Sequence, residues 1–548
     1  MNRKHWMMLA ALLLCIPLMT GCNAMDAQET SGDLSVLDAS TAPPIVQEHA
    51  ASTQPPQTEN TANTAPNAGL RTDEAYREAE GVDLGVAWYT TRYGQGYELH
   101  VSGTAIPDRW INSVAHFTNK DGNGNNLMNQ IVSLVVQDDV MSIGERAFAN
   151  CSELEYVELG AGLTGMGNQV FFGCQKLYKV EFSGAEVPAA ALKGNQVVQA
   201  VSIRGGCTSV GKEAFSGCTA LSTVEGAMAD LVQLGEGAFA GCTALTAMPA
   251  MTSLHQLGDS AFAKCTALKA APHMPELRLM GEYAFAGCTA LQHIAFPETL
   301  ISVGNYAFQN CSELREISFP AWGDLKVGNN AFEKCTALST VVLTKAVYAI
   351  GNEGFRGCSS LTSLTLEGQD SLGSNLLSEC SNVLVIVKGR VPAAALKDSG
   401  AVVGVSFEGN TVIPAQAFSG CTALKELNFS EKQPVRIIGE EAFYGCTALG
   451  AVQLGEGLEA LGSRAFADCT NMTEITMPRS LKKIGSAVFA RVQAFAEDHR
   501  KKIRFAGSEA EWNKVEKPAQ KTGVSWSAGI TASDTATLTI TYLNQKNP

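Results

Sequence analysis

The sequence has few basic and few aromatic residues. Its 548 residues carry 40 Lys and Arg against 54 Asp and Glu, which gives a net charge of −14. No basic patch is available to neutralise phosphates, so we expect no nucleic-acid partner. Aromatic residues make up only 7% of the chain, yet 22 of them are Phe, which indicates that Phe serves one fixed position.

The sequence also lacks the motifs that carry most enzyme chemistry. No H-E-x-x-H, C-x-x-C, G-x-S-x-G or Walker loop occurs, so we expect no catalytic residue, metal or cofactor. His255, His273 and His293 fall on successive repeats, but their phases differ, so they should not converge on a metal. Residues 121–126 (DGNGNN) are similar to the start of a calcium loop, but Val132 stands where a chelating Glu is needed, which favours a polar turn.

The N-terminus holds an apolar run that is too short to cross a membrane. Residues 1–21 have the charged start and short apolar stretch of a secretory signal, and no later run approaches 18 apolar residues. The segment LMTGC, which ends at Cys22, resembles a bacterial lipobox; by that resemblance Cys22 is lipidated, and the alternative is an ordinary signal with a chance cysteine. Residues 22–80 have almost no large apolar side chains and are expected to form a disordered, acidic tether.

Ala-Phe pairs recur through the chain with a period near 23 residues. With two degenerate units that share the letters VPAAAL (187–192 and 391–396), and with Leu377 in the last vacancy, the series contains about sixteen units. Apolar residues at i, i+4, i+5, i+8 and i+11 predict a short helical turn, and the alternation that follows predicts a short strand. One such unit cannot bury its own apolar face, whereas a stack of sixteen can.

Two other positions of the unit are nearly fixed. The residue after the consensus Ile is Gly in thirteen units and Pro in three; because Pro fixes φ near −65°, the position should not need positive φ and should instead be short of space. Thirteen units carry Cys three residues after the Phe. We expect these cysteines to be free, buried thiols, because each has two equivalent neighbours and no designated partner. Cys207 lies out of phase and has no predicted role.

The segments IGERAFANCSELEYVEL, LGEGAFAGCTAL and VGNYAFQNCSELREISFP resemble the BspA-like class of bacterial leucine-rich repeats. The resemblance implies an α/β repeat solenoid with short parallel strands on the concave face, short helical or 3-10 turns opposite, and caps at both ends. It also implies display on bacterial surfaces, where some members bind host matrix proteins or other cells. It supplies no catalytic or ligand-binding motif.

The flanks resemble the same class. ELHVSGTAIPDR (98–109) is similar to its amino-terminal cap and FAGSEAEW (505–512) to its closing motif. The expected organisation is a signal peptide (1–21), a tether (22–80), an N-terminal cap (81–140), a solenoid (141–505) and a C-terminal cap with a terminal strand (506–548). Residues 535–543 alternate with period two and are expected to form that strand, either as part of the cap or as a separate element.

Strand residues between the core positions vary from unit to unit, which suits a scaffold that displays a tailored surface. The predicted concave-face contacts are Gln292, His293, Arg315, Glu316, Ser318, Thr340, Thr365, Lys425, Glu426 and Asn428. The predicted function is protein–protein interaction by a lipid-anchored cell-surface protein, with adhesion to host matrix or other cells. The alternative is a cell-envelope scaffold that binds a partner in the same cell, and a hydrolase is the least favoured reading.

Overall fold

The computed structural model describes residues 77–120, 124–226, 228–409, 412–492, 495, 503–518 and 540–543. The chain divides into two units, 1–71 and 72–548, and every described residue lies in the second. The predicted signal, Cys22 and most of the tether lie outside the described residues. No helix among the described residues is long and apolar enough to span a membrane.

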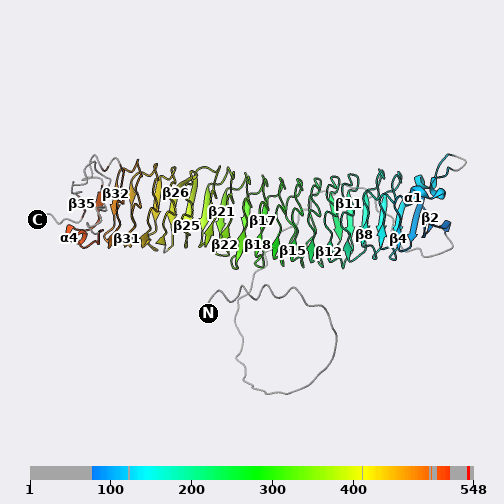
Figure 1. Cartoon of the computed structure of the whole chain (residues 1–548), viewed down its shortest axis with the longest axis horizontal. Coiled ribbons are helices and arrows are strands. Elements are labelled where there is room, and N and C mark those ends of the chain that lie inside the picture. Colours follow the sequence, from blue (N-terminus) through cyan, green and yellow to red (C-terminus); the bar gives the residue numbers. More distant parts are fainter. Residues whose placement is uncertain are drawn as a thin grey trace, which may run out of the picture. The chain divides into compact units, whose positions relative to one another are not determined.

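Successive repeats stack side by side through the second unit, about fifteen turns in all, and most contribute two parallel strands where the sequence predicted one (Figure 1). The first row, called face A, comprises β5 (Ile131–Val136), β7 (Tyr156–Leu159), β9 (Lys179–Phe182), β11 (Ala200–Ile203), β13 (Thr223–Gly226), β17 (His293–Ala295), β19 (Glu316–Ser318), β21 (Thr340–Leu343), β23 (Ser363–Leu366), β25 (Val383–Val387), β26 (Val402–Phe407), β28 (Glu426–Phe429), β30 (Val452–Gln453), β32 (Ile475–Met477) and β34 (Ile503–Phe505).

The second row, called face B, is made of shorter strands that end at the consensus Ile-type residue. It comprises β4 (Ala105–Ile106), β6 (Ser142–Ile143), β8 (Gly165–Met166), β10 (Glu186–Val187), β12 (Ser209–Val210), β14 (Gln233–Leu234), β15 (Gln256–Leu257), β16 (Leu279–Met280), β18 (Ser302–Val303), β20 (Leu325–Val327), β22 (Val347–Ile350), β24 (Ser371–Leu372), β27 (Val412–Ile413), β29 (Ile437–Ile438), β31 (Ala460–Leu461) and β33 (Lys483–Ile484). β10 to β24 form one nine-stranded sheet, whereas face A is divided after β13, β19 and β28.

The two ends of the stack differ from its repeats. At the N-terminal end β1 (Arg77–Asp83), β2 (Val86–Tyr93) and β3 (Gly96–Ser102) form an antiparallel meander, and β3 pairs in parallel with β5. The short helices α1 (Trp110–Ser113), α2 (Ala115–Thr118) and η3 (Leu127–Gln130) follow. At the other end α4 (Glu509–Trp512) follows β34, and β35 (Thr541–Tyr542) pairs with β34. Of the predicted terminal strand, residues 535–539 lie outside the described residues.

The third side of each repeat is a turn, and the predicted helix there is not confirmed: between Ile131 and Val492 no described residue is helical. In one repeat, Tyr283, Phe285 and Gly287 donate their N–H groups to carbonyls of the next repeat at 2.7–2.9 Å. Tyr283 and Gly287 have φ values of 55° and 74°, and left-handed residues at this spacing interrupt a right-handed helix. The apolar pattern that predicted a helix therefore belongs to a series of turns, one in each repeat, joined by hydrogen bonds between repeats.

Stacked Phe side chains and buried Cys side chains recur through the core, with Leu192, Leu377 and Leu396 in place of Phe in three units. Phe285 is fully buried, and its ring lies 5.2 Å from Phe262 and 5.4 Å from Phe308, centroid to centroid. The prediction of free thiols is confirmed for the cysteines that the structure describes, of which all but the partly buried Cys380 are buried. Twelve in-phase thiols donate to a backbone carbonyl of the preceding repeat at 3.0–3.3 Å. Cys207 is also buried, and its Sγ donates to the Ser209 carbonyl at 3.3 Å.

The near-invariant glycine lies where two repeats approach most closely, as predicted. Gly304 does not have positive φ, but a Cβ on it would lie 2.5 Å from the backbone N of Glu282 and 2.5 Å from the carbonyl carbon and oxygen of Gly281. These three atoms belong to the preceding repeat and cannot move without disturbing its ladder. The position is therefore restricted by contact between backbones.

We expect Gly304→Ala to lower the free energy of unfolding by about 1–3 kcal/mol, because overpacking forces the backbone to shift. The matched control is Gly450→Ala: a Cβ on Gly450 meets nothing within 4 Å, and its φ is not positive. That change should lie within about 0.5 kcal/mol of the parent chain. Urea denaturation followed by circular dichroism measures both, and equal midpoints for the two variants would contradict the close-contact explanation.

Candidate functional site: the exposed surface of face A

The predicted contact residues fall into two groups on face A. His293 lies on β17 and is paired in register with Glu316 on β19, and Ser318 follows on the same strand. Gln292 and Arg315 come directly before these strands, and the N–H of Arg315 donates to the Gln292 carbonyl at 2.9 Å. All five residues are exposed. The pairing of β17 with β19 brings this first group together on and beside one two-stranded sheet.

The second group lies on the five-stranded sheet β21-β23-β25-β26-β28. Thr340 is on β21, Glu426 and Asn428 are on β28, and Lys425 immediately precedes β28; all four are exposed. Thr365 on β23 departs from the prediction, because only 5% of its surface is accessible. Its register partners on the neighbouring strands are Val342 and Ile386, and it is buried in the row that they form. Thr365 is therefore not an exposed contact.

Three apolar residues of this sheet, Val342 on the edge strand β21 and Leu384 and Ile386 on β25, form what we call the platform. Val342 is 43% exposed and Leu384 is 52% exposed, although both lie on strands of a packed sheet. A Cβ on Gly404 would lie 2.9 Å from Leu384 Cδ2, so the glycine on β26 leaves room for the leucine side chain. The strand β23, which carries Thr365, lies between the two strands that bear these residues. Exposed apolar residues on one face of a sheet are typical of interaction surfaces.

Trp322 is a further exposed residue that the sequence analysis did not single out. It is 75% exposed and lies in the loop between β19 and β20. The Glu298 carboxylate accepts hydrogen bonds from the N–H groups of Ala321 (3.1 Å) and Trp322 (3.0 Å), and Thr344 Oγ1 donates to the Pro320 carbonyl at 2.6 Å. The loop is thus fixed to the repeats on either side of it. The available signal was the 24-residue step from Phe308 to Phe332, one residue longer than its neighbours.

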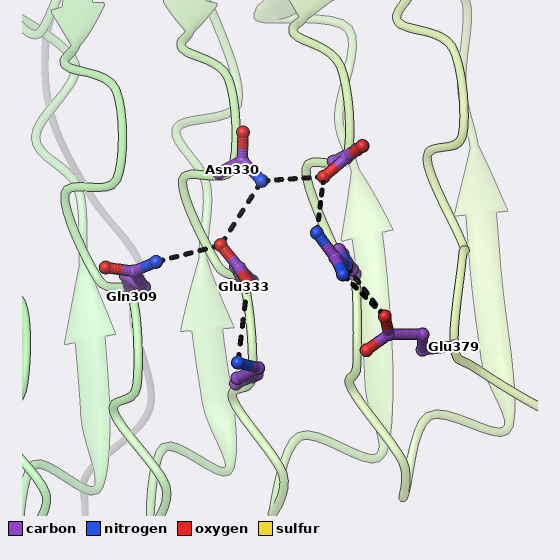
Figure 2. Close-up of polar contacts among 7 residues, drawn as sticks. Gln309, Asn330, Glu333 and Glu379 are labelled. Atoms are coloured by element: carbon purple, nitrogen blue, oxygen red, sulfur yellow. Dashed lines mark hydrogen bonds and ion pairs between the residues drawn. The ribbon is translucent and has the colours of Figure 1, made fainter.

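The turn side carries a network of paired polar groups instead of an open site (Figure 2). Glu333 is only 5% exposed, and its Oε2 accepts hydrogen bonds from Gln309 Nε2 at 2.9 Å and Asn330 Nδ2 at 3.2 Å. Arg356 donates to Glu379 Oε1 at 2.6 Å, and this contact lowers the pKa of the Glu379 carboxyl. These side chains come from successive turns and are hydrogen-bonded to one another, so the network links the repeats.

No cluster of three or more His, Cys, Asp or Glu side chains with metal-binding geometry occurs among the described residues. His255, His273 and His293 are all described, and they are not part of any such cluster. In the loop that is similar to a calcium site, residues 121–123 lie outside the described part, while Asn126 forms an antiparallel bridge with Lys120. The surface of face A remains the candidate site.

A family model described as a BspA type leucine-rich repeat region, with six copies of the repeat, matches residues 126–225, 185–274, 272–384 and 395–499. Comparison with curated proteins finds no match. Among solved structures, a leucine-rich repeat protein from Bacteroides ovatus is 22% identical, with 78% of this chain and 94% of that chain covered and a TM-score of 0.42. A leucine rich cell surface protein from Faecalibacterium prausnitzii is 18% identical, with 80% and 97% covered and a TM-score of 0.26. Because both TM-scores are low, the assignment to a family rests on the family model.

Proposed function

The chain belongs to the BspA-type leucine-rich repeat family, and from this membership we propose that it is a lipid-anchored cell-surface protein that binds other proteins through face A. The observation that carries the proposal is the platform, where Val342, Leu384 and Ile386 expose apolar surface on a rigid sheet. The Trp322 loop supports it, because hydrogen bonds hold the loop backbone and because Trp is enriched among residues that dominate binding energy. Host matrix proteins and the surfaces of other cells are the proposed partners.

We expect Leu384→Asp to weaken binding to a protein partner at least tenfold, because a carboxylate on the platform would be desolvated in the interface. The matched control is Val412→Asp, which places the same charge at a 50% exposed position on face B. The probes are purified collagen, fibronectin and laminin together with co-resident cells, and saturable binding of the full chain is measured by surface plasmon resonance or cell adhesion. If no probe binds, or if the two variants lose binding equally, the proposal for face A is wrong.

The proposed anchor is a lipid on Cys22. The second candidate function is a cell-envelope scaffold that binds a partner in the same cell. Cys22→Ala should release the chain from the membrane fraction, because a single thioether-linked lipid anchor would then be missing. Protease treatment of intact cells separates the two functions. Loss of the repeats from undamaged cells supports surface display, whereas protection of the repeats until the cells are lysed supports the scaffold.

A further inference from the structure

A pocket on face A arises where the repeat is longest. The step from Phe418 to Phe443 is 25 residues, against 23 in the two steps that follow, and the extra length lies in the loop at 430–434 after β28. The five-stranded sheet ends at β28, and β30 belongs to a different sheet. A hollow of about 490 Å³ opens beside the loop. This volume lies within the range of pockets that hold small organic ligands.

One wall of the pocket is an aromatic ring in a fixed position. The Phe429 ring is only partly buried and stacks on the buried Phe407 ring, with centroids 5.4 Å apart and planes inclined by 15°. Its other flank is set by Gly455, where a Cβ would lie 2.8 Å from Phe429 Cβ. The N–H of Ser430 donates to the Phe407 carbonyl at 2.9 Å and ties the start of the loop to β26. The ring is therefore held before any ligand arrives.

The remaining lining is polar, and most of its side chains have no partner among the described residues. Among the described residues, no hydrogen bond or ion pair is made by the side chains of Ser406, Glu408, Asn428, Lys432 and Gln433. Ser430 also lines the pocket, and its Oγ accepts a hydrogen bond from the Lys432 N–H at 3.3 Å. Glu408 and Lys432 carry opposite charges but do not pair with each other. Charged residues in the following repeats do pair: Arg436 and Lys482 both form ion pairs with Glu459, at 3.1 and 3.2 Å. Glu408, Asn428, Lys432 and Gln433 are exposed around the hollow, so their polar groups are available to a ligand without breaking any contact within the described protein.

The chemistry of the lining selects a ligand rich in hydroxyl groups. Each hydroxyl donates one hydrogen bond and accepts others, and the amides of Asn428 and Gln433 likewise do both. The Glu408 carboxylate accepts, the Lys432 ammonium donates, and the accessible part of the Phe429 ring offers apolar contact to the C–H groups of a sugar ring. An apolar ligand would leave these groups without partners, and a small ion would satisfy only one of the two charges. We propose that this pocket is a carbohydrate-binding site that takes one or two neutral sugar rings.

The test applies the full chain to an array of neutral and charged glycans and measures each hit by isothermal titration with the free mono- or disaccharide. The expected result is saturable binding to at least one neutral saccharide, weakened about fivefold or more by Asn428→Ala, because one hydrogen bond is lost. The control is Gln453→Ala, which removes an exposed amide from β30 outside the pocket and should leave the affinity unchanged.

Three results would overturn the site: an array with no hit, binding only to charged glycans, or binding that survives both Asn428→Ala and Glu408→Gln. Circular dichroism of each variant establishes that loss of binding is not loss of fold. The site is independent of the proposed protein-binding platform. A chain that binds a matrix protein but no glycan would therefore contradict this inference alone, and a chain that binds only glycans would contradict the proposed function alone.

Discussion

Raising the pH from about 8 to about 10 is expected to unfold the repeats, because the unfolded chain ionises its thiols and the folded chain does not. Burial is the largest cause of a raised pKa for eleven in-phase cysteines, Cys218 to Cys469, and it raises the pKa of Cys311 and of Cys469 to about 12. The ordinary value is 9.0. Stability is therefore fully present below pH 9 and is lost as the pH rises from the unfolded pKa towards the folded one.

The expected effect is large because the same shift recurs along the stack. One buried thiol contributes a slope of about 1.4 kcal/mol per pH unit once the unfolded chain is ionised, so eleven thiols contribute roughly 15 kcal/mol per unit. A domain is typically stable by about 5–15 kcal/mol, so the transition should be complete within about one pH unit above 9. Circular dichroism follows the unfolding, and thiolate absorbance in the ultraviolet should rise in the same transition.

The control removes thiols without changing the fold. In a variant with Cys288→Ala, Cys311→Ala and Cys335→Ala, the free energy of unfolding should fall less steeply with pH, by about 4 kcal/mol per pH unit. Urea titrations at several values of pH give the slope for each chain, so the small cavities left by Ala alter the intercept and not the comparison. Identical slopes for the parent and the triple variant would show that burial of the thiols does not govern alkaline stability.

Replacing Phe285 with Ala is expected to lower the free energy of unfolding by about 3–5 kcal/mol, the range found when a buried Phe is truncated. The ring is fully buried and touches the rings of the repeats before and after it, at 5.2 and 5.4 Å. Its loss opens a cavity at the interface between repeats, and such nearest-neighbour interfaces contribute directly to the stability of a stacked array.

Phe172 is the matched control, because it is the same residue type next to a ladder position but 51% exposed. Phe172→Ala loses a contact in which the Arg146 guanidinium lies 5.0 Å from the ring centroid and should cost less than about 1 kcal/mol. Urea denaturation measures both variants. If Phe285→Ala unfolds in two transitions, the cavity has separated the array into two cooperative parts, which the same mechanism predicts for a disrupted interface.

The period of the repeat, the buried thiols and the crowded glycine followed from the sequence because each depends on a residue type that recurs in phase. The side chain of Phe285 fills the equivalent space in its repeat to that of Phe308, and the same residue type marks this environment in thirteen units. The unequal spacing of the Phe residues was visible in the sequence, but its structural meaning was not. The longer spacings from Phe308 to Phe332 and from Phe418 to Phe443 correspond to the Trp322 loop and to the pocket beside β28.

The turns and the second row of strands did not follow from the sequence. The left-handed residue two positions before the Phe is Tyr283 in one repeat and Glu353 in another, so no residue type identifies it. Face B strands are mostly two residues long, too short for an alternating pattern to be visible. Both features depend on hydrogen bonds to the next repeat, which only the stacked structure supplies. Thr365 was misassigned for a related reason, since its burial comes from neighbours on β21 and β25 and not from its own strand.

The parallel ladders have a consequence for how such a chain changes over generations. Every rung joins a residue to its equivalent about 23 positions away, as Val341 is paired with Leu364 and Leu364 with Val385. A duplication or deletion of one whole repeat by recombination would therefore place equivalent residues next to each other again. Each strand, turn and thiol would then form the same type of contact with its new neighbour as with the old one. The molecule can alter its length in steps of one repeat while the sequences on its exposed surface are reshuffled.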